Sequence, residues 1–277
     1  MAKILFHQYG KTQVRLTQVV RNGEEHRLAE LTVKILFEGD FEEAYSNADN
    51  SKVLPTDTMK NMVYVLAGQK PIASPEQFAQ DLAAHFLGSV SHLQRVKVDC
   101  LQAPWAHIGD HGSAFVQSGS ERRLAASSAT REDHTITAGI RGLEILKTGE
   151  SAFSGYLKDE YTTLPETRDR LFGTVLDASW TYRNAALDFN AAHASIRKSL
   201  LETFASHQSE SVQHSLYDMG TAALKTHDTV SEIHLVMPNK HRILFDLKRF
   251  GLENPNQVFI STDEPSGYIE AKLSADT

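Results

Sequence analysis

A tight turn between two long extended runs constrains the fold of this chain most. Asn22-Gly23 is typical of a two-residue hairpin turn, because both residue types readily adopt a positive φ. Strand-forming residues lie on both sides of the turn, at positions 13–20 and 28–38, and apolar and polar residues largely alternate in the second run. The chain is therefore predicted to open with a long antiparallel β-hairpin.

Helices are predicted directly after the hairpin. The first covers residues 58–66, with Thr56 or Asp57 as its N-cap. The second begins at Ser74-Pro75, where a capping box and a proline at the first helical position coincide. Its apolar residues recur at four-residue spacing and predict one buried stripe: Phe78, Leu82 and Phe86. Extended runs then follow at 96–100, 114–116 and 122–126.

The second half of the chain repeats this order of elements. Two extended runs, at 134–146 and 175–182, precede a helix that Asp188 or Asn190 is expected to cap. A further helix is expected to open at Ser211. Its apolar positions predict a buried face made of Val212, Leu216, Met219 and Ala223.

The last two strands complete the repeat. They are predicted at 232–237 and 242–247, with a hairpin tip between them at 238–240. Each half then reads strand, strand, helix, helix, strand, strand. This pattern predicts an α+β fold with antiparallel sheets and helices packed on one face, duplicated in domains 1–132 and 133–277.

Composition excludes several classes of function. A formal net charge of −7, dispersed along the chain, disfavours nucleic acid as a partner. Cys100 is the only cysteine, which excludes an intrachain disulfide and a multi-thiolate metal site and fits a reducing compartment. No segment is typical of a signal peptide or a membrane span, so no membrane partner is expected. The C-terminal residues 272–277 lack a Ser-Lys-Leu address, and a bacterial-type cytoplasmic location is expected.

Common cofactor motifs are also missing. The chain has neither a Gly-x-Gly-x-x-Gly nor a phosphate-loop sequence, so no nucleotide cofactor is expected. His107 and His111 have the i, i+4 spacing of a helical metal site, but Gly109 and the preceding Pro104 favour a loop with solvated histidines. No metal is expected at the functional site.

Five clusters carry the chemical information. They are Tyr9-Gly10-Lys11, Thr56-Asp57 with Lys60-Asn61, the stretch 146–170, Ser211-Val212-Gln213 and Pro238-Asn239-Lys240-His241. Each alone has an ordinary structural explanation, such as a helix start or an exposed histidine. In this order and at this spacing they closely resemble the urate oxidase (uricase) family, over nearly the whole chain. Gly149 departs from the family pattern, which more often has threonine there.

The resemblance implies a fold, an assembly and a reaction. The family has tandem tunnelling-fold (T-fold) domains, which associate as dimers into a β-barrel and then as a homotetramer with active sites between subunits. Its members oxidise urate with O2 and water to 5-hydroxyisourate and hydrogen peroxide, with no cofactor. One subunit would supply Lys11, Thr56 and Asp57. The neighbouring subunit would supply Phe153, Arg170, Val212, Gln213, Asn239 and His241.

The roles that the resemblance implies suit the residue types. Arg170 and Gln213 would hold opposite edges of urate by paired hydrogen bonds, and Phe153 would stack on its ring. The backbone amides of Thr56 and Asp57 would meet its imidazole side.

A proton relay is implied for the chemical step. Lys11 would act as the base through the Thr56 hydroxyl, since a partly desolvated amine loses its proton more easily. His241 would extend the relay, and Asn239 and Thr56 would hold first O2 and then water. Val212 is expected to make packing and backbone contacts.

Two other functions are also compatible with the sequence. A pterin- or purine-processing relative of the same fold would need a metal-binding set of histidines. A purine-binding protein would bind urate without consuming O2. Metal content and O2 uptake distinguish these functions from a urate oxidase.

Overall fold

The computed structural model describes residues 2–275, which form two compact units. Unit 1 comprises the described residues up to Gly139 together with Trp180–His193. Unit 2 comprises Ile140–Ser179 together with the described residues from Ala194 onward. The domain boundary at residues 132 and 133 stays a prediction. Met1, Asp276 and Thr277, on which the expectations about the chain ends partly depend, lie outside the described residues.

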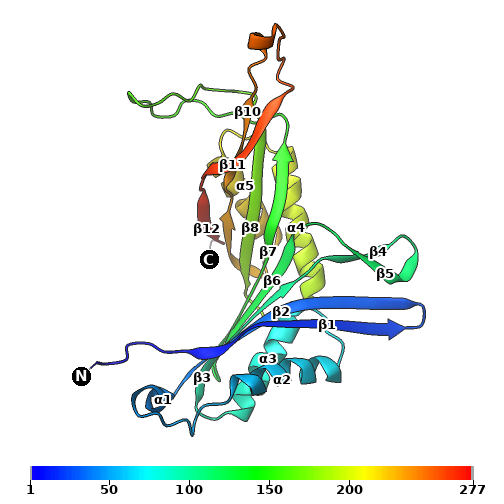
Figure 1. Ribbon diagram of the computed structural model, residues 1–277, viewed down its shortest axis with the longest axis vertical. Coiled ribbons are helices and arrows are strands. Elements are labelled where there is room, and N and C mark those ends of the chain that lie inside the picture. The colour runs from blue at the N-terminus through cyan, green and yellow to red at the C-terminus, as the bar shows by residue number, and fades with distance from the viewer. Residues whose placement is uncertain (1, 276–277) are drawn as a thin grey trace. The chain divides into compact units, whose positions relative to one another are not determined.

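The strands and helices follow each other as an α+β chain (Figure 1). The strands are β1 (Tyr9–Asn22), β2 (Glu25–Gly39), β3 (Leu93–Gln102), β4 (Trp105–Ile108), β5 (His111–Gln117), β6 (Arg122–Ala129), β7 (His134–Lys147), β8 (Phe172–Tyr182), β9 (Val230–Val236), β10 (Asn239–Leu244), β11 (Phe259–Gly267) and β12 (Glu270–Ser274). The helices are α1 (Glu42–Ser46), α2 (Thr56–Gln69), α3 (Pro75–Ser89), α4 (Phe189–Ser206), α5 (Val212–Thr226) and the short 3₁₀ helix η1 (Lys248–Phe250).

The predicted hairpin is confirmed and is longer than expected. β1 pairs with β2 in antiparallel register from Tyr9 to Asn22, and Gly23 takes φ +60° in the turn. In unit 1 the strand order is β1-β2-β3-β6. The apolar residues that alternate in β2, from Leu31 to Phe37, are at most 1% exposed and face the core.

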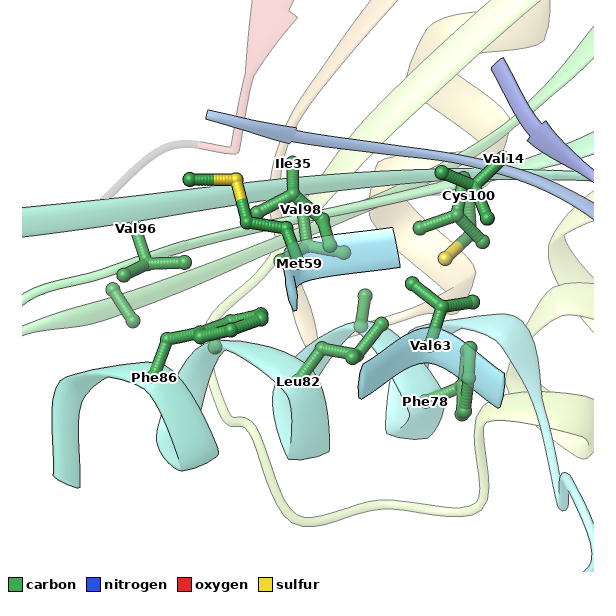
Figure 2. Close-up of a cluster of buried hydrophobic side chains, with 14 of the residues drawn as sticks. Val14, Ile35, Met59, Val63, Phe78, Leu82, Phe86, Val96, Val98 and Cys100 are labelled. Carbon is green, nitrogen blue, oxygen red and sulfur yellow. The ribbon is translucent and has the colours of Figure 1, made fainter. Parts of the chain in front are cut away.

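The core of unit 1 lies between this sheet and helices α2 and α3 (Figure 2). Met59 and Val63 of α2 and the predicted stripe of α3 point toward the strands. The strands contribute Val14, Ile35, Val96, Val98 and Cys100. Burying each large side chain stabilises the fold by about 1.5–3 kcal/mol. This packing fixes the start of β1 and the start of α2 in one unit.

Three of the four predicted helix starts are confirmed. The hydroxyls of Ser74 and Ser211 accept hydrogen bonds from the amides of Gln77 and His214, and Asp188 accepts from the amides of Asn190 and Ala191.

The predicted start of the first of these helices, α2, is wrong. α2 begins two residues early, at Thr56, and neither Thr56 nor Asp57 caps it. Pro55 holds the N-cap position with φ −55°, and its carbonyl oxygen accepts from the amides of Thr58 and Met59. The restricted φ of proline suits such a start.

Unit 2 repeats the arrangement of helices on strands, and β8, β9 and β12 follow one another in the sheet as β2, β3 and β6 do in unit 1. α5 packs on β9 and β12, and its predicted buried face is confirmed. The predicted hairpin tip at 238–240 is wrong, because β9 and β10 do not pair with each other. β10 pairs with β8 and β11, and β9 pairs with β8 and β12. Pro238, which has no N–H to donate, interrupts the path between the two strands.

Sequence patterns missed or misassigned several short elements. As predicted, the chain from His107 to His111 is not helical and both histidines are exposed, but it forms a tight hairpin instead of a loop, since β4 and β5 pair on either side of Gly109 at φ +56°. α1, η1 and the two C-terminal strands were not predicted. None of the helices in the described part of the chain is both long and apolar enough to cross a membrane.

Candidate active site

Lys11 lies in β1 beside an irregularity in its pairing with β2. Lys11 pairs with Ile35 and the next regular pair is Val14 with Val33, so two residues of β1 face one residue of β2. Gln13, in this bulge, takes φ 58°, which is uncommon for a residue other than glycine. Directly paired residues of antiparallel strands point to the same face. Lys11 therefore shares the face of the buried Ile35, which α2 and α3 cover.

Gly10 permits a close approach of β1 to β2. A Cβ atom at Gly10 would lie 1.8 Å from the carbonyl oxygen of Ile35, so no other residue fits without moving the backbone. Tyr9, just before it, packs edge-on against Phe37 and Phe41, with ring centroids 5.8 and 4.7 Å away. The Tyr9-Gly10-Lys11 cluster thus has two structural residues beside the candidate base.

Tyr9 also ties β1 to the start of α2. Its hydroxyl donates to the carbonyl oxygen of Leu54 at 3.2 Å and accepts from the amide of Leu54 at 2.9 Å. Asp57 lies just beyond, and a hydrogen bond from Lys60 lowers the pKa of its carboxyl group. The positive charge of Lys11 lowers that pKa further. Lys11 and the first turn of α2 therefore lie close together in unit 1.

The first turn of α2 leaves hydrogen-bond donors open. Within the described residues, the amides of Thr56 and Asp57 have no backbone partner, and no side chain caps the helix. An uncapped helix start with free amides attracts oxygen and ring-nitrogen acceptors of a ligand. This matches the role that the resemblance assigns to the two amides.

The segment between β7 and β8 carries Phe153 and Arg170, and backbone bonds hold it in unit 2. The amides of Ala152 and Ser209 donate to the carbonyl oxygens of Ser209 and Glu150, at 2.7 and 2.9 Å. The amide of Arg170 donates to Ser151 at 2.9 Å. Both ends of the segment are therefore anchored next to the α4–α5 connection.

Arg170 is a partly buried cation whose hydrogen-bond capacity is unused. Its guanidinium carbon lies 5.5 Å from the ring centroids of both Phe153 and Phe172. Its Nε and Nη2 atoms are buried, and neither has a hydrogen-bond partner among the described residues. Burial lowers the pKa of this guanidinium. Leaving buried donors unpaired costs about 1–3 kcal/mol each, so the side chain is poised for an acceptor.

The Phe153 ring already stacks with another aromatic side chain. Tyr156 stacks on it with centroids 4.8 Å apart and ring planes at 17°. A planar ligand on Phe153 must use its other face or displace Tyr156. The sequence patterns did not single out Tyr156, although it lies in the stretch 146–170.

Val212 and Gln213 occupy the first turn of α5. Val212 is 4% exposed and belongs to the core, as expected for a packing residue, whereas Gln213 is exposed and free to meet a ligand. Ser209 bridges Ser151 just before this turn, and its hydroxyl accepts from Ser215 at 2.8 Å. The backbone thus links this helix start to the Arg170 segment.

Asn239 and His241 lie half-buried in β10, at a second irregularity. Asn239 pairs with Gly267 and His241 with Thr262, and the register shifts between them. Asn239 also pairs with Thr174 of β8, whose buried hydroxyl has no partner among the described residues. β-bulges often lie at functional sites because they change the direction of a side chain.

The predicted site residues form two groups. Lys11, Thr56 and Asp57 lie together in unit 1. In unit 2, Phe153 and Arg170 are in contact, and Gln213 is linked to them through Ser209. Asn239 and His241 lie on β10, which pairs with β8. The sharing of one site by both groups stays a prediction.

A family model described as Uricase matches residues 7–127 and 136–270 of this chain. The chain is 41% identical over 270 residues to a uricase of Arthrobacter globiformis, with 98% of this chain and 89% of the relative covered. It is 34% identical over 280 residues to a uricase of Dictyostelium discoideum, with 99% and 98% covered. The crystal structure of the Arthrobacter globiformis uricase superposes with a TM-score of 0.96 at 40% identity, covering 99% of this chain and 96% of that one.

Proposed function

Because the chain belongs to the uricase family, we propose that it is a urate oxidase that converts urate, O2 and water to 5-hydroxyisourate and hydrogen peroxide. The match extends over nearly the whole chain. The assignment of a site rests on Arg170, a partly buried cation whose buried Nε and Nη2 atoms have no partner among the described residues. A planar, anionic ligand with adjacent acceptors, such as urate, satisfies both donors at once.

Substrate binding is proposed to depend on hydrogen bonds to opposite edges of urate. Arg170 donates to a urate carbonyl oxygen and a neighbouring ring nitrogen, and Gln213 donates to and accepts from the opposite edge. Phe153 stacks on the ring plane. The open amides of Thr56 and Asp57 bind the imidazole side of urate. Val212 packs and contributes backbone contacts.

Proton removal is proposed as the central catalytic task. A urate dianion is a much better reductant of O2 than the monoanion, so a base that removes the second proton promotes electron transfer. Lys11 takes this proton through the Thr56 hydroxyl, and His241 extends the relay. Asn239 and Thr56 hold O2 and later water above the ring.

The proposed reaction balances without a separate electron carrier. Urate gives two electrons to O2 and forms a peroxide adduct, which releases hydrogen peroxide. Water then adds to the dehydrogenated ring, and its oxygen becomes the 5-hydroxyl group. The relay returns to the peroxide the proton that it took from urate, and the second proton comes from the water that adds to the ring, so Lys11 ends the cycle in its starting state.

We also propose the assembly that the family resemblance implies. The Lys11 group and the Arg170 group would come from neighbouring subunits of a homotetramer. The isolated monomer is then expected to be inactive. Activity measured across a dilution series, alongside sedimentation, checks this, since turnover by a true monomer contradicts it.

A urate assay tests the function directly. Chelator-treated protein with urate is expected to consume one O2 and release one hydrogen peroxide per urate. Urate binding without O2 uptake would identify a purine-binding protein. Activity that disappears on chelation and returns with metal would identify a metal-dependent relative of the same fold.

The Lys11→Met variant tests the relay. General-base catalysis contributes about 10²- to 10⁴-fold, so kcat is expected to fall in this range while the affinity for a non-reacting urate analogue changes little. Lys34→Met, on the neighbouring strand and paired with Asp99 at 3.3 Å, is the matched control and should keep normal kcat. Equal losses of kcat and analogue affinity in Lys11→Met would mean that Lys11 positions the substrate instead.

A further inference from the structure

Three potential metal ligands meet where α4 connects to α5. His207 follows the last residue of α4, and His214 and Asp218 lie one turn apart on α5. His207 Nδ1 is 2.9 Å from Asp218 Oδ2, and His214 Nε2 is 3.7 Å from the same oxygen. One ligand atom from each residue lies within 4.8 Å of the others. All three belong to unit 2.

The backbone fixes all three residues before any ligand binds. The i, i+4 spacing of His214 and Asp218 places both side chains on one face of α5. Ser211 caps the same helix through the amide of His214 at 3.1 Å. The amide of His207 donates to Thr203 at 3.0 Å, and the Lys147 ammonium donates to the carbonyl oxygen of His207. An ion that binds here would therefore meet a largely preformed site.

The ligand set and its spacing suit a particular class of ion. Two imidazole nitrogens and a carboxylate are ligands that Zn²⁺ commonly takes, at about 2.0–2.2 Å, which puts tetrahedral ligand atoms roughly 3.3 Å apart. The two distances to Asp218 Oδ2, 2.9 and 3.7 Å, lie on either side of this value. Calcium and magnesium prefer oxygen ligands alone and fit this cluster poorly.

Burial defines an inner and an outer side of the cluster. The His207 side chain is 8% exposed, and its Nε2 is buried with no partner among the described residues, so Nδ1 is the atom that faces the cluster. His214 and Asp218 are 44% and 37% exposed. The outer side gives an ion a path from solvent and leaves its fourth position to water.

We propose that His207, His214 and Asp218 bind one divalent ion of the zinc type. The ion joins the end of α4 to the first turns of α5 and closes the connection that contains Ser209. Because Ser209 bridges the segment that carries Phe153, the ion stabilises this part of unit 2. No step of the proposed urate oxidation passes through it.

Zinc binding to chelator-treated protein tests the proposal. Calorimetry with zinc chloride is expected to give one ion per chain, and cobalt is expected to give the visible absorption of a tetrahedral site. Zinc is also expected to raise the melting temperature. His214→Gln and Asp218→Asn should each weaken zinc binding by more than about 10-fold and abolish the rise. Both positions are partly exposed, so both variants are expected to fold, which circular dichroism checks.

His234→Gln is the matched control. His234 Nε2 lies 2.6 Å from Glu270 Oε1, a partly exposed pair in the same unit that offers only two ligand groups. This variant should bind zinc as the unchanged protein does. The proposal is overturned if the unchanged protein binds no zinc, or if His214→Gln binds it equally well. It is also overturned if His234→Gln loses as much affinity as His214→Gln, which would show binding by scattered surface histidines.

Discussion

Two partly buried arginines, Arg123 in unit 1 and Arg170 in unit 2, have opposite hydrogen-bond environments. Arg123 donates to both carboxylate oxygens of Glu76, at 3.0 and 2.7 Å, and also to the Asn190 side chain and the carbonyl oxygen of Phe189. Arg170 lies against two phenyl rings, and its Nε and Nη2 have no partner within residues 2–275.

The difference separates a structural role from a binding role. Glu76 is fully buried, so the Arg123 pair exists at a desolvation cost that only complete pairing offsets. Burying Arg170 has a similar desolvation cost, but the fold supplies no hydrogen bonds to its Nε and Nη2 that offset this cost. A ligand can supply these hydrogen bonds. A saturated buried cation holds elements together, whereas an unsaturated one marks a place where something binds.

Replacing Arg170 should have the largest effect, and on activity rather than stability. Arg170→Ala removes two charge-assisted hydrogen bonds to urate, so kcat/KM is expected to fall by roughly 10²- to 10⁴-fold, mainly through a higher KM. The melting temperature should hardly change. Steady-state kinetics and thermal denaturation on the same preparation measure both quantities.

The neighbouring Arg168 supplies the control for this prediction. It is exposed and lies two residues earlier in the same segment. Arg168→Ala should leave kcat/KM near the normal value. If Arg170→Ala binds urate normally, or if it unfolds the protein, the contrast with Arg123 does not hold.

Replacing Arg123 should mainly lower stability. Arg123→Ala leaves the Glu76 carboxylate buried without a partner, so the free energy of unfolding is expected to fall by about 3–5 kcal/mol. Urea denaturation measures it, and kcat/KM of the folded fraction should stay close to normal. The double variant Glu76→Leu with Arg123→Leu removes both charges and should recover much of the loss. A double variant as unstable as Arg123→Ala would mean that the loss comes from the Asn190 and Phe189 contacts.

The starts of α2 and α3 show the same contrast between a structural and a binding role, with smaller changes in stability. Ser74 caps α3, so Ser74→Ala should lower the free energy of unfolding by about 0.5–2 kcal/mol with little effect on turnover. Thr56 caps nothing, so Thr56→Ala should change stability by less than about 0.5 kcal/mol and lower kcat. The reverse pattern in denaturation and kinetics would remove Thr56 from the proposed relay.

Local sequence signals predicted most of the fold. The hairpin at Asn22-Gly23, the stripe that begins at Phe78 and the serine cap at Ser211 were all correct, because each depends on neighbours within a few residues. The start of α2 was misjudged because Pro55 competes with the usual capping residues. The predicted hairpin between β9 and β10 was wrong because β9 pairs with β8 and β12, which are distant from it in the sequence.

The site residues could be predicted mainly from the family resemblance. Periodicity gives no information on the segment from 148 to 171, whose shape depends on Ser209, far along the chain. Nor does any pattern show that Tyr156 stacks on Phe153 or that Arg170 has free donors, since burial depends on tertiary packing. The His207 cluster was also missed, because its seven-residue gap to His214 crosses a helix boundary.

The bulge after Lys11 changes which residues of β1 face the core, from odd-numbered to even-numbered positions. From Val14 onward the even-numbered positions 14 and 16 face the core, whereas before the bulge odd-numbered Tyr9 and Lys11 do. The bulge absorbs one extra residue, so Lys11 and Val14 face the same side of the sheet although they lie three positions apart. Deleting Gln13 would relieve its positive φ and leave a regular strand in which Lys11 still pairs with Ile35 and Val14 with Val33, so both would keep the core face. If the same residues paired without a bulge, either Lys11 or Val14 would turn to the opposite face, so the side on which the candidate base emerges depends on the irregular pairing itself.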